Sequence, residues 1–474
     1  MMDAAVTADS NTVLNSIRDR VGRSVPTGWR LTTLGECFTW SSGGTPRRTD
    51  PSYFGGDIPW AVIGDLNDGV ITDTQSSITD AGLRNSSAKW VEPGSVLVAM
   101  YGSIGKLAIA GRRLTTNQAI AFTKPDPVDP KYLYYYLLWQ RPSLARLGKG
   151  ATQLNISQTV IKQFPFLLAP PDEQRRIVAE IEKQFSRLDE AVANLKRVKA
   201  SLKRYKASVL KAAVEGRLVP TEAELARREE RAFDTAAEHL TRLHGAGKDG
   251  RQGRLGGATR ADQVTSELPV LPPGWCWSDF EAVADRVTVG HVGPMKDEYV
   301  AEGIPFLRSQ NVRPNRYDPE GLKFISPDFH SKLQKSALEP GDIVVVRSGS
   351  VGVACVIPES LPVANCSDLV IVKRPRGVLA NFGAVYLNAV VDSRIAAGRV
   401  GVALAHFNTK SVAKLPVPVP PMAEQVRIVL EVERRMSVAA AVEVEVDLNL
   451  ERARSARHAL LKAMFIGQAS EAQE

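Results

Sequence analysis

Two hydrophobic patterns of different period divide this chain into segments of two kinds. Short apolar runs such as "SVLVAMY" (95–101) and "DIVVVRS" (342–348) follow the turn signals "EPG", which is typical of β-strands. Two longer segments instead repeat apolar residues every seven positions, which is typical of a coiled-coil helix. The pattern therefore predicts β-rich globular parts that alternate with long helices.

The heptad segments predict helices over 172–216 and 422–468. Asp172 after a Pro-Pro pair is a plausible N-cap, and Gly216 suits a helix end. The residues expected to pair the helices are Ile181, Leu188, Leu195, Leu202, Val209, Val432, Val446 and Leu460. A second row is expected at Ile177, Ala191, Val198, Tyr205 and Ala212, with Asn449 on the other row of the second helix, where it could fix the register. The alternative is that each helix packs only on its own globular domain.

Both kinds of segment occur twice in the same order. "FLLAPPDEQRRIVAEIE" (166–182) corresponds to "VPVPPMAEQVRIVLEVE" (417–433), and "EPGSVLVAMYGSIG" (92–105) corresponds to "EPGDIVVVRSGSVG" (339–352). "GDIPWAVIGDL" with "EGIPFLRSQNV" and "LKAAVEG" with "LKAMFIG" extend the series. A repeated unit of this size indicates duplication of a whole domain with its helix.

The duplication sets the predicted fold and domain boundaries. We expect an α/β (α+β) fold with two β-rich globular domains in tandem, separated by two long helices that form an antiparallel coiled coil. The domains are predicted at 25–171 and 269–421, and the helices at 172–216 and 422–468. The remaining predictions are a loosely attached N-terminal leader at 1–24, a charged helix and Gly-rich linker at 217–268, and a tail at 469–474.

Composition narrows the function classes without choosing one. The 474 residues carry a net charge of +8, which is compatible with a polyanionic partner. No apolar stretch reaches the roughly 18 residues of a membrane span, and the N-terminus lacks the apolar core of a signal peptide. Four cysteines without short paired spacing suit a reducing compartment. We therefore expect a cytoplasmic protein.

No motif for catalysis is recognisable in the sequence. The Pro-Pro pairs lack the neighbours of an amino-methyltransferase loop, and "YGSIGK" (101–106) lacks the spacing and the Ser or Thr of a phosphate-binding loop. Neither a nucleophile elbow, a His-Glu-x-x-His motif nor a Cys/His metal cluster is present. The interpretation that follows is a binding protein without catalytic residues or a metal site, although an enzyme with an unrecognised motif stays an alternative.

Polar loops in both β-rich domains have the composition of a DNA-reading surface. Arg suits guanine, Asn and Gln suit adenine, and Lys, Ser and Thr suit phosphates. The candidate DNA-binding residues are Thr45, Arg47, Arg48, Ser103, Lys106, Asn117, Gln118, Lys149, Gln153, Asn155, Arg308, Gln310, Asn311, Arg313, Arg316, Ser350, His406, Asn408 and Lys410. The alternative is that these segments are ordinary surface loops. Basic clusters on the helices could follow phosphates, face solvent or dock another protein.

In motif order and spacing, the chain resembles the specificity subunits of type I restriction–modification enzymes. The motifs are "GWRLTTLGE", "GGTPRR", "YFGGDIPW", "VEPGSVLVAMYGSIGKLAI", "TNQAI", "NISQTVIKQFPFLLAPPDEQRRIVAEIE" and "LKAAVEGRLVP", which recur in weaker form in the second half. The second half departs from the pattern where "NCSD" (365–368) replaces "TNQAI" (116–120), so loop chemistry is not transferable between the copies.

The resemblance implies a DNA sequence-recognition subunit without catalysis of its own. Each β-rich domain would be a target recognition domain that reads half of a split, asymmetric site in double-stranded DNA. Two modification subunits that methylate adenine would dock on the helices, and restriction subunits that translocate and cleave DNA would join them. S-adenosylmethionine, ATP and Mg would belong to those partners, with no cofactor in this chain and no membrane partner. A scaffold that uses the same duplicated frame without DNA is the rival hypothesis.

Overall fold

The chain folds as two compact units, each built around one β-rich domain. A computed structural model describes residues 10–23, 25–125, 128–149, 154–245, 268–392 and 408–466. Unit 1 comprises Met1–Lys196 with Asp447–Glu474, and unit 2 comprises Arg197–Val446. Because both long helices contribute to both units, each unit contains its domain, the start of one helix and the end of the other.

Domain 1 consists of three small sheets and five short or medium helices with two 3-10 turns. The strand orders are β2-β10-β7-β8-β4, β5-β3-β9-β6 and β1-β11. The strands are β1 Arg30–Thr33, β2 Trp40–Ser42, β3 Phe54–Ala61, β4 Gly69–Ile71, β5 Ser77–Ile78, β6 Trp90–Val91, β7 Val96–Ala99, β8 Leu107–Ala110, β9 Leu114–Thr116, β10 Ile120–Thr123 and β11 Pro165–Leu168. The helices and turns are α1 Ser10–Gly22, α2 Leu34–Cys37, η1 Pro51–Tyr53, η2 Ile63–Asp65, α3 Asp80–Arg84, α4 Pro130–Arg146 and α5 Gln158–Gln163.

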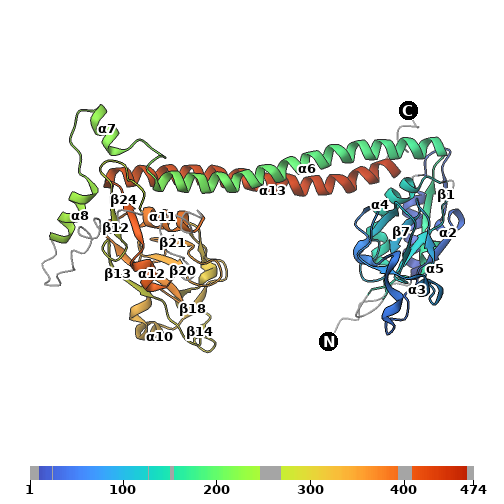
Figure 1. Cartoon of the computed structure of the whole chain (residues 1–474), viewed down its shortest axis with the longest axis horizontal. Helices are drawn as coiled ribbons and strands as arrows, with labels where there is room; N and C mark the ends of the chain where they lie inside the picture. Colours follow the sequence, from blue (N-terminus) through green and yellow to red (C-terminus); the bar gives the residue numbers. More distant parts are fainter. Residues whose placement is uncertain are drawn as a thin grey trace. The chain divides into compact units, whose positions relative to one another are not determined.

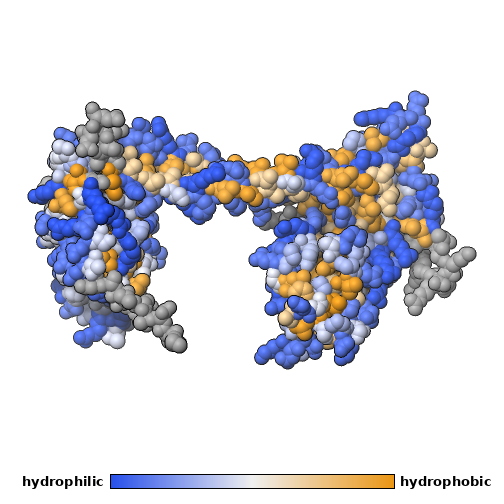
Figure 2. Space-filling model, turned by 180° about the vertical axis from the view of Figure 1, so that it is seen from behind, coloured by the Kyte–Doolittle hydropathy of each residue, from blue (hydrophilic) through white to orange (hydrophobic). Residues whose placement is uncertain are grey.

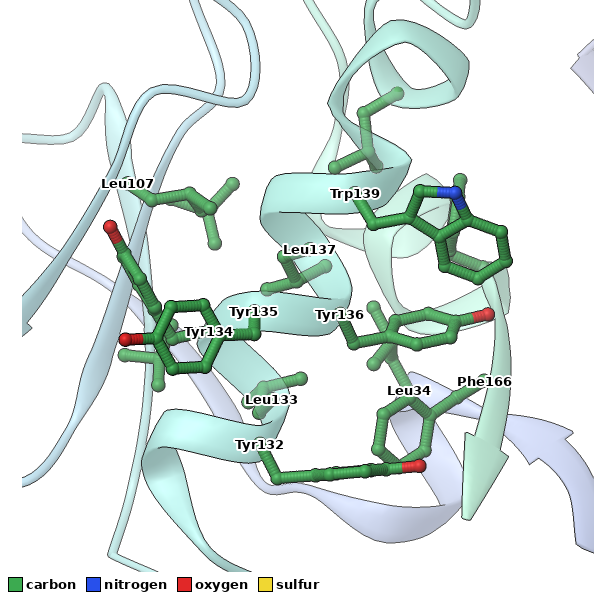
Figure 3. Close-up of a cluster of buried hydrophobic side chains, with 14 of the residues drawn as sticks. Leu34, Leu107, Tyr132, Leu133, Tyr134, Tyr135, Tyr136, Leu137, Trp139 and Phe166 are labelled. Carbon is green, nitrogen blue, oxygen red and sulfur yellow. The ribbon is translucent and has the colours of Figure 1, made fainter. Parts of the chain in front are cut away.

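The core of domain 1 forms where α4 covers the central sheet. Every residue of β7 and β10 is buried, so these strands lie in the middle of the packed layers. The aromatic run of α4 lies against Phe166 of β11 and Leu34 of α2 (Figure 3). Tyr136 donates a hydrogen bond to the Pro165 carbonyl oxygen at 2.9 Å, which satisfies a hydroxyl that would otherwise be buried without a partner.

Domain 2 repeats this plan and adds the hairpin β16-β17. The strand orders are β13-β23-β20-β21, β14-β18-β15-β22-β19, β12-β24 and β16-β17. The strands are β12 Cys276–Asp279, β13 Ala284–Val289, β14 Tyr299–Val300, β15 Ile304–Leu307, β16 Val312–Arg313, β17 Arg316–Tyr317, β18 Lys323–Ile325, β19 Ala337–Leu338, β20 Ile343–Val346, β21 Ala354–Val356, β22 Ala364–Cys366, β23 Leu369–Pro375 and β24 Pro416–Val419. Its helices and turns are η3 Ser309–Asn311, α10 Pro327–Lys332, η4 Gln334–Ser336, α11 Ala380–Asp392 and α12 Thr409–Ala413.

The predicted heptad segments form two long helices, α6 Pro171–Val214 and α13 Met422–Ile466. Inside each unit they lie side by side (Figure 1). In unit 1, Arg457 pairs with Asp189 and covers the Phe185 ring at 4.8 Å. In unit 2, Lys206 pairs with Glu443. Glu222, which lies beyond the end of α6, donates its backbone N–H to Glu424 near the start of α13. The two helices therefore run antiparallel and contact each other, as the heptad pattern predicts.

Burial along the helices corrects one of the two predicted rows. Ile181, Val209, Val432 and Val446 are buried, and Leu188, Leu195, Leu202 and Leu460 are half-buried. In the second predicted row, Ile177 is buried and Ala212 is half-buried, as expected, whereas Ala191, Val198 and Tyr205 between them are exposed. In that stretch the second row instead runs through Phe185, Val192 and Lys206, which lie four positions after Ile181, Leu188 and Leu202. Because this row contains Lys206, a search for apolar residues at heptad spacing does not detect it.

The Glu-Gln pair of the repeated junction ties each domain to its helix. Trp29 donates its indole N–H to Glu173, and Trp275 donates to Glu424 Oε1 at 3.0 Å. Gln425 Nε2 donates to the Pro420 carbonyl at 2.9 Å, and its Oε1 accepts the Leu379 N–H at 2.7 Å. Gln174 makes the equivalent bonds to Ala169 and Asp129. The duplicated motif thus joins the end of a strand, the start of the long helix and the start of the domain helix.

The end of α6 confirms the helix stop predicted at Gly216. This glycine has φ of +68°, and Arg217 N–H donates to the Ala212 carbonyl at 2.9 Å. That six-to-one bond over a left-handed glycine closes the helix and satisfies one of its last carbonyls.

Two predicted connecting segments differ from expectation. Residues 10–22 of the supposed leader form α1, whose Leu14, Ile17 and Val21 are buried in the core of unit 1. The single charged helix expected near 221–245 is two helices, α7 Glu222–Arg228 and α8 Ala236–Gly245. The chain turns between them, where Glu230 has φ of +49°. The Gly-rich linker expected at 246–260 and the tail at 469–474 lie outside the described residues.

Candidate nucleic-acid interface

Three loops of domain 1 leave the same edge of its five-stranded sheet, where four strand ends lie together. Antiparallel pairing places the end of β2, the start of β10, the end of β7 and the start of β8 at this edge. Gly43 N–H donates to the Ile120 carbonyl at 3.3 Å, and Met100 N–H donates to the Ala119 carbonyl at 2.8 Å. We call this edge, with the loops that leave it, the reading edge of domain 1.

The segment before α5 joins the same edge. Ile156 N–H donates to the Met100 carbonyl at 2.9 Å, and Gly102 N–H donates to the Leu154 carbonyl at 3.0 Å. Asn155 forms isolated backbone bridges with Tyr101 and Lys149. These bonds bring together loops that are separated by about 50 residues of sequence.

Several predicted residues of domain 1 are exposed at this edge. Arg47, Arg48, Ser103 and Lys149 are exposed, and Thr45 is hydrogen-bonded to the exposed Gln118. Others are held by the domain itself: Lys106 is half-buried with Nζ 3.5 Å from the Ile63 carbonyl oxygen, and Asn117 Oδ1 accepts the Ala119 N–H at 3.1 Å. Gln153 lies outside the described residues.

The glycines of "GGTPRR" are required by close backbone packing. A Cβ on Gly43 would lie 2.0 Å from the Thr116 carbonyl oxygen, and one on Gly44 would lie 2.2 Å from Ser87 Oγ. Because neither position has room for a side chain, the two glycines hold the start of the arginine loop against the sheet. Arg47 and Arg48 therefore extend from a firmly placed base.

Domain 2 builds an equivalent reading edge from the end of β13 and the start of β23. Gly290 N–H donates to the Leu369 carbonyl at 2.8 Å, and a Cβ on Gly290 would lie 1.9 Å from the Ser367 carbonyl oxygen. Leu307, the last residue of β15, accepts the Ser367 N–H at 2.9 Å. The segment that follows β15 therefore leaves from this same edge, and it carries five of the predicted residues.

One of those five is a structural residue, which corrects the prediction for Asn311. Its side chain is fully buried. Asn311 Oδ1 accepts the Arg308 N–H at 3.0 Å, and Nδ2 donates to the carbonyl oxygens of Asp318 and Glu320 at 2.9 and 3.1 Å. With these bonds inside the loop, Asn311 shapes the segment and has no surface to offer DNA.

The remaining residues of this segment are partly engaged. Arg308 and Gln310 both donate to the Gly321 carbonyl, at 2.7 and 3.3 Å. Arg313 donates to Asp318 at 3.0 Å, and this hydrogen bond lowers the pKa of the Asp318 carboxyl. Arg316 is exposed. Arg308 and Arg313 therefore donate to acceptors within the segment.

The last described residues of the prediction for domain 2 lie in the loop after β20 and at α12. Ser350 is exposed after β20, and Lys410 is exposed on α12. Asn408 is exposed and is the N-cap of α12, where its Oδ1 accepts the Ser411 N–H at 2.8 Å, and its DNA contact stays a prediction. His406 lies outside the described residues.

Sequence reasoning missed several residues at the two edges. Arg347 follows β20 and pairs with Asp368, and His291 contacts the Phe329 ring at 5.6 Å between ring centroids. In domain 1, Tyr101 and Leu154 are exposed in the two segments that the Gly102–Leu154 backbone bond joins. Alignment of the two repeats could have identified Arg347. "VVVRS" (344–348) aligns with "LVAMY" (97–101), which places Arg347 at the position of Met100, directly after β7.

The described part of the chain contains no cluster of three or more His, Cys, Asp or Glu residues arranged to hold a metal ion. Within the same ranges, no helix has the length and apolar character to cross a membrane.

Comparison with known sequences identifies relatives over both domains. The family model of the type I restriction modification DNA specificity domain matches residues 26–204 and 292–433. The MjaIX specificity subunit of Methanocaldococcus jannaschii is 28% identical over 178 residues, which cover 36% of this chain and 40% of that relative. The EcoBI specificity subunit of Escherichia coli is 21% identical over 351 residues, which cover 72% of this chain and 67% of the relative. The alignment to the MjaIX subunit thus spans about two fifths of its length.

Solved structures share the fold. A chain from a structure on complex assembly and conformational transition of the type I R-M system has a TM-score of 0.64 at 18% identity, covering 94% of this chain and 99% of that one. The HsdS subunit from Thermoanaerobacter tengcongensis has a TM-score of 0.52 at 18% identity, covering 94% and 98%. Because the family model matches more than half of the residues, across both β-rich domains and their helices, this chain belongs to the type I restriction–modification DNA specificity family.

Proposed function

We propose that this chain is the DNA sequence-recognition subunit of a type I restriction–modification complex, reading a bipartite, asymmetric site with its two domains. The observation that carries the proposal is the pair of reading edges. Both start from the same backbone geometry, with Gly43 and Gly290 packed against a carbonyl oxygen, yet the loops beyond them differ in sequence. Equivalent frames with different tips suit two half-sites of different sequence.

The exposed side chains at these edges suit DNA. Arg47, Arg48 and Lys149 in domain 1 and Arg316 in domain 2 are exposed, as is Lys410 on α12. Arg reads guanine through two hydrogen bonds in the major groove, and both Arg and Lys contact phosphates. The net charge of +8 favours association with a polyanion.

Docking of two modification subunits on the helices is supported by an exposed apolar surface of α13. Leu430, Val438, Val444 and Leu448 are 48–61% exposed, and hydrophobic colour continues along the helices in Figure 2. Exposed aliphatic residues on a helix are typical of a protein interface. In this proposal restriction subunits join the assembly, S-adenosylmethionine, ATP and Mg²⁺ reside in the partner subunits, and the complex works in the cytoplasm.

Methylome sequencing of cells with the complete system tests the proposal. We expect a bipartite adenine-methylation motif that disappears when this chain is deleted and returns when it is supplied again. The purified chain alone should neither methylate nor cleave DNA, and activity from the isolated chain would contradict the non-catalytic role.

Salt dependence separates this proposal from the rival scaffold hypothesis. DNA binding by the assembled complex should fall steeply with salt, because each phosphate contact releases counterions. Replacing Arg47 and Arg48 together by Ala should make that slope shallower. A complex that assembles normally but shows no salt-dependent DNA binding would favour the scaffold.

A further inference from the structure

The loops that leave the two reading edges start from equivalent backbone positions. Gly44 N–H donates to the Thr116 carbonyl at 2.9 Å, and His291 N–H donates to the Cys366 carbonyl at 2.8 Å. Thr116 and Cys366 are the last residues of β9 and β22, each of which pairs in parallel with the corresponding strand, β3 or β15. Residues 45–48 and 292–295 are therefore counterparts, and their side chains leave the same place in each domain.

The two tips differ completely in chemistry. Domain 1 presents Thr-Pro-Arg-Arg at 45–48, with both guanidinium groups exposed. Domain 2 presents Val-Gly-Pro-Met at 292–295, and Val292 is 67% exposed. A single exposed valine is ordinary on a protein surface. What distinguishes Val292 is that it occupies the place where the other domain begins its cationic tip.

The loop of Val292 is anchored at its base, and its next cation along the chain, the exposed Lys296, follows four residues later. His291 is anchored by its backbone bond to Cys366 and by its edge-on contact with Phe329. The cation at the end of β20, Arg347, is already paired with Asp368. At this position of the reading edge, domain 2 therefore exposes an aliphatic side chain, whereas the tip of domain 1 exposes hydrogen-bond donors.

Among the four bases, only thymine presents a methyl group in the major groove, and apolar side chains recognise it by contact. We propose that Val292 reads a thymine methyl group in the half-site bound by domain 2, whereas the tip of domain 1 reads its half-site through Arg47 and Arg48. This inference rests on the proposed DNA-recognition function. It adds the class of base contact made by one named residue.

Deoxyuridine tests the inference, because it differs from thymidine only in the missing methyl group. The full chain, assembled with its modification subunits, is titrated with duplexes carrying the motif found by methylome sequencing, with thymines of the second half-site replaced singly by uracil. At one position the wild-type complex should bind about fourfold more weakly, the effect of losing one buried methyl-sized group. With Val292→Ala, thymine and uracil duplexes should bind alike at that position.

Two matched controls locate the effect. Val363 is 46% exposed and precedes β22, so it lies at the sheet edge opposite the reading edge. Val363→Ala should keep the wild-type preference for thymine, and uracil in the first half-site should have the same effect with Val or Ala at position 292. Equal weakening of Val292→Ala on thymine and uracil duplexes would overturn the inference.

The outcomes separate this inference from the function on which it rests. Sequence-specific binding that ignores every thymine methyl of the second half-site overturns the role of Val292 and leaves the recognition function standing. Absence of any sequence preference in the assembled complex overturns the recognition function itself.

Discussion

In unit 1 the end of α13 packs through aromatic rings, whereas in unit 2 the end of α6 packs through aliphatic side chains. Phe465 is fully buried, with its ring centroid 5.3–5.5 Å from those of Tyr132, Tyr136 and Trp139. Its counterpart in the "LKAAVEG" repeat is Val214, which is half-buried beside Leu210 and Ala213. The same helix-end position is thus filled by side chains of very different volume.

A second difference lies under the "EPG" turn of each domain. In domain 2 the buried Asp342 pairs with Lys373, whose side chain is 9% exposed, and accepts backbone N–H groups from Glu339 and Arg374 at 2.9 and 3.0 Å. In domain 1 the counterparts are Ser95, whose buried Oγ has no hydrogen-bond partner, and the exposed Lys124. An ion pair in one copy replaces a nearly apolar arrangement in the other.

The features that the two units share are the ones that set backbone direction. The Trp–Glu bond, the bridging Gln and the glycine at the start of the reading edge occur in both. Core side chains and loop tips differ. The comparison teaches that the frame constrains where the loops begin, while packing and recognition chemistry vary independently in each copy.

Removal of the buried carboxylate should produce the largest effect. Asp342→Ala leaves the Lys373 ammonium buried without its partner, and we expect unit 2 to lose on the order of 3–5 kcal/mol of unfolding free energy. Ser95→Ala, the matched change in domain 1, should be close to neutral, since its hydroxyl has no partner to lose. Urea unfolding of the full chain with hydrogen exchange of each unit measures both. Equal losses in the two units would show that the difference between the copies is not energetic.

Truncation of the aromatic helix end should have the next largest effect. We expect Phe465→Ala to cost unit 1 about 3 kcal/mol, the low end for a buried Phe, because the end of a helix can relax around the cavity. Val214→Ala should cost unit 2 only about 1 kcal/mol, as a half-buried aliphatic side chain loses less contact. The same exchange measurement reports each unit separately, and a larger loss for Val214→Ala would contradict the aromatic anchoring of unit 1.

Loss of a guanidinium at the reading edge should act on DNA and leave folding intact. Arg47→Ala should weaken binding by about 1–3 kcal/mol and relax sequence preference in one half-site if Arg47 contacts a base. Arg112, which is exposed after β8 at the opposite edge, supplies the control, and Arg112→Ala should leave the preference unchanged. Binding of the assembled complex to duplexes mutated in either half-site distinguishes the cases. Uniform weakening on all sequences would identify Arg47 as a phosphate contact.

The sequence alone was sufficient for the features that repeat or follow a period. The β-runs at β7 and β20, the two long antiparallel helices and the stop at Gly216 are all confirmed by the structure. Duplication helped, because a signal that is ambiguous in one copy is supported by the other. Hydrophobic period and turn residues are local, so they are visible without knowledge of distant contacts.

What escaped prediction depends on contacts between distant residues. Asn311 is polar and loop-like in sequence, yet its partners Asp318 and Glu320 fold back over it and bury it. Lys206 interrupts the apolar row of α6 because its partner, Glu443, comes from the other helix. The reading edge itself is assembled by strand pairing between separate parts of each domain. The DNA contacts of its side chains stay predictions.

The smallest expected effect concerns a matched pair of carboxylates on the two helices. Arg434 and then Arg435 donate to Glu431, and these hydrogen bonds lower its pKa to about 2. At the corresponding position of α6, a hydrogen bond from Gln184 and then one from Lys183 lower the pKa of Glu180. A carboxyl whose folded pKa is depressed stabilises the fold above its unfolded pKa of 4.5, and this contribution disappears as the pH falls.

Glu431→Gln should therefore destabilise unit 2 at pH 6, with a difference from wild type that shrinks between pH 4.5 and 2. Glu180→Gln should change unit 1 in the same direction but less, because one neutral amide and one lysine replace two guanidinium donors. Urea titrations across that pH range measure both variants. A difference that does not depend on pH would assign the role of Glu431 to packing, since only an ionised carboxylate gives the predicted titration.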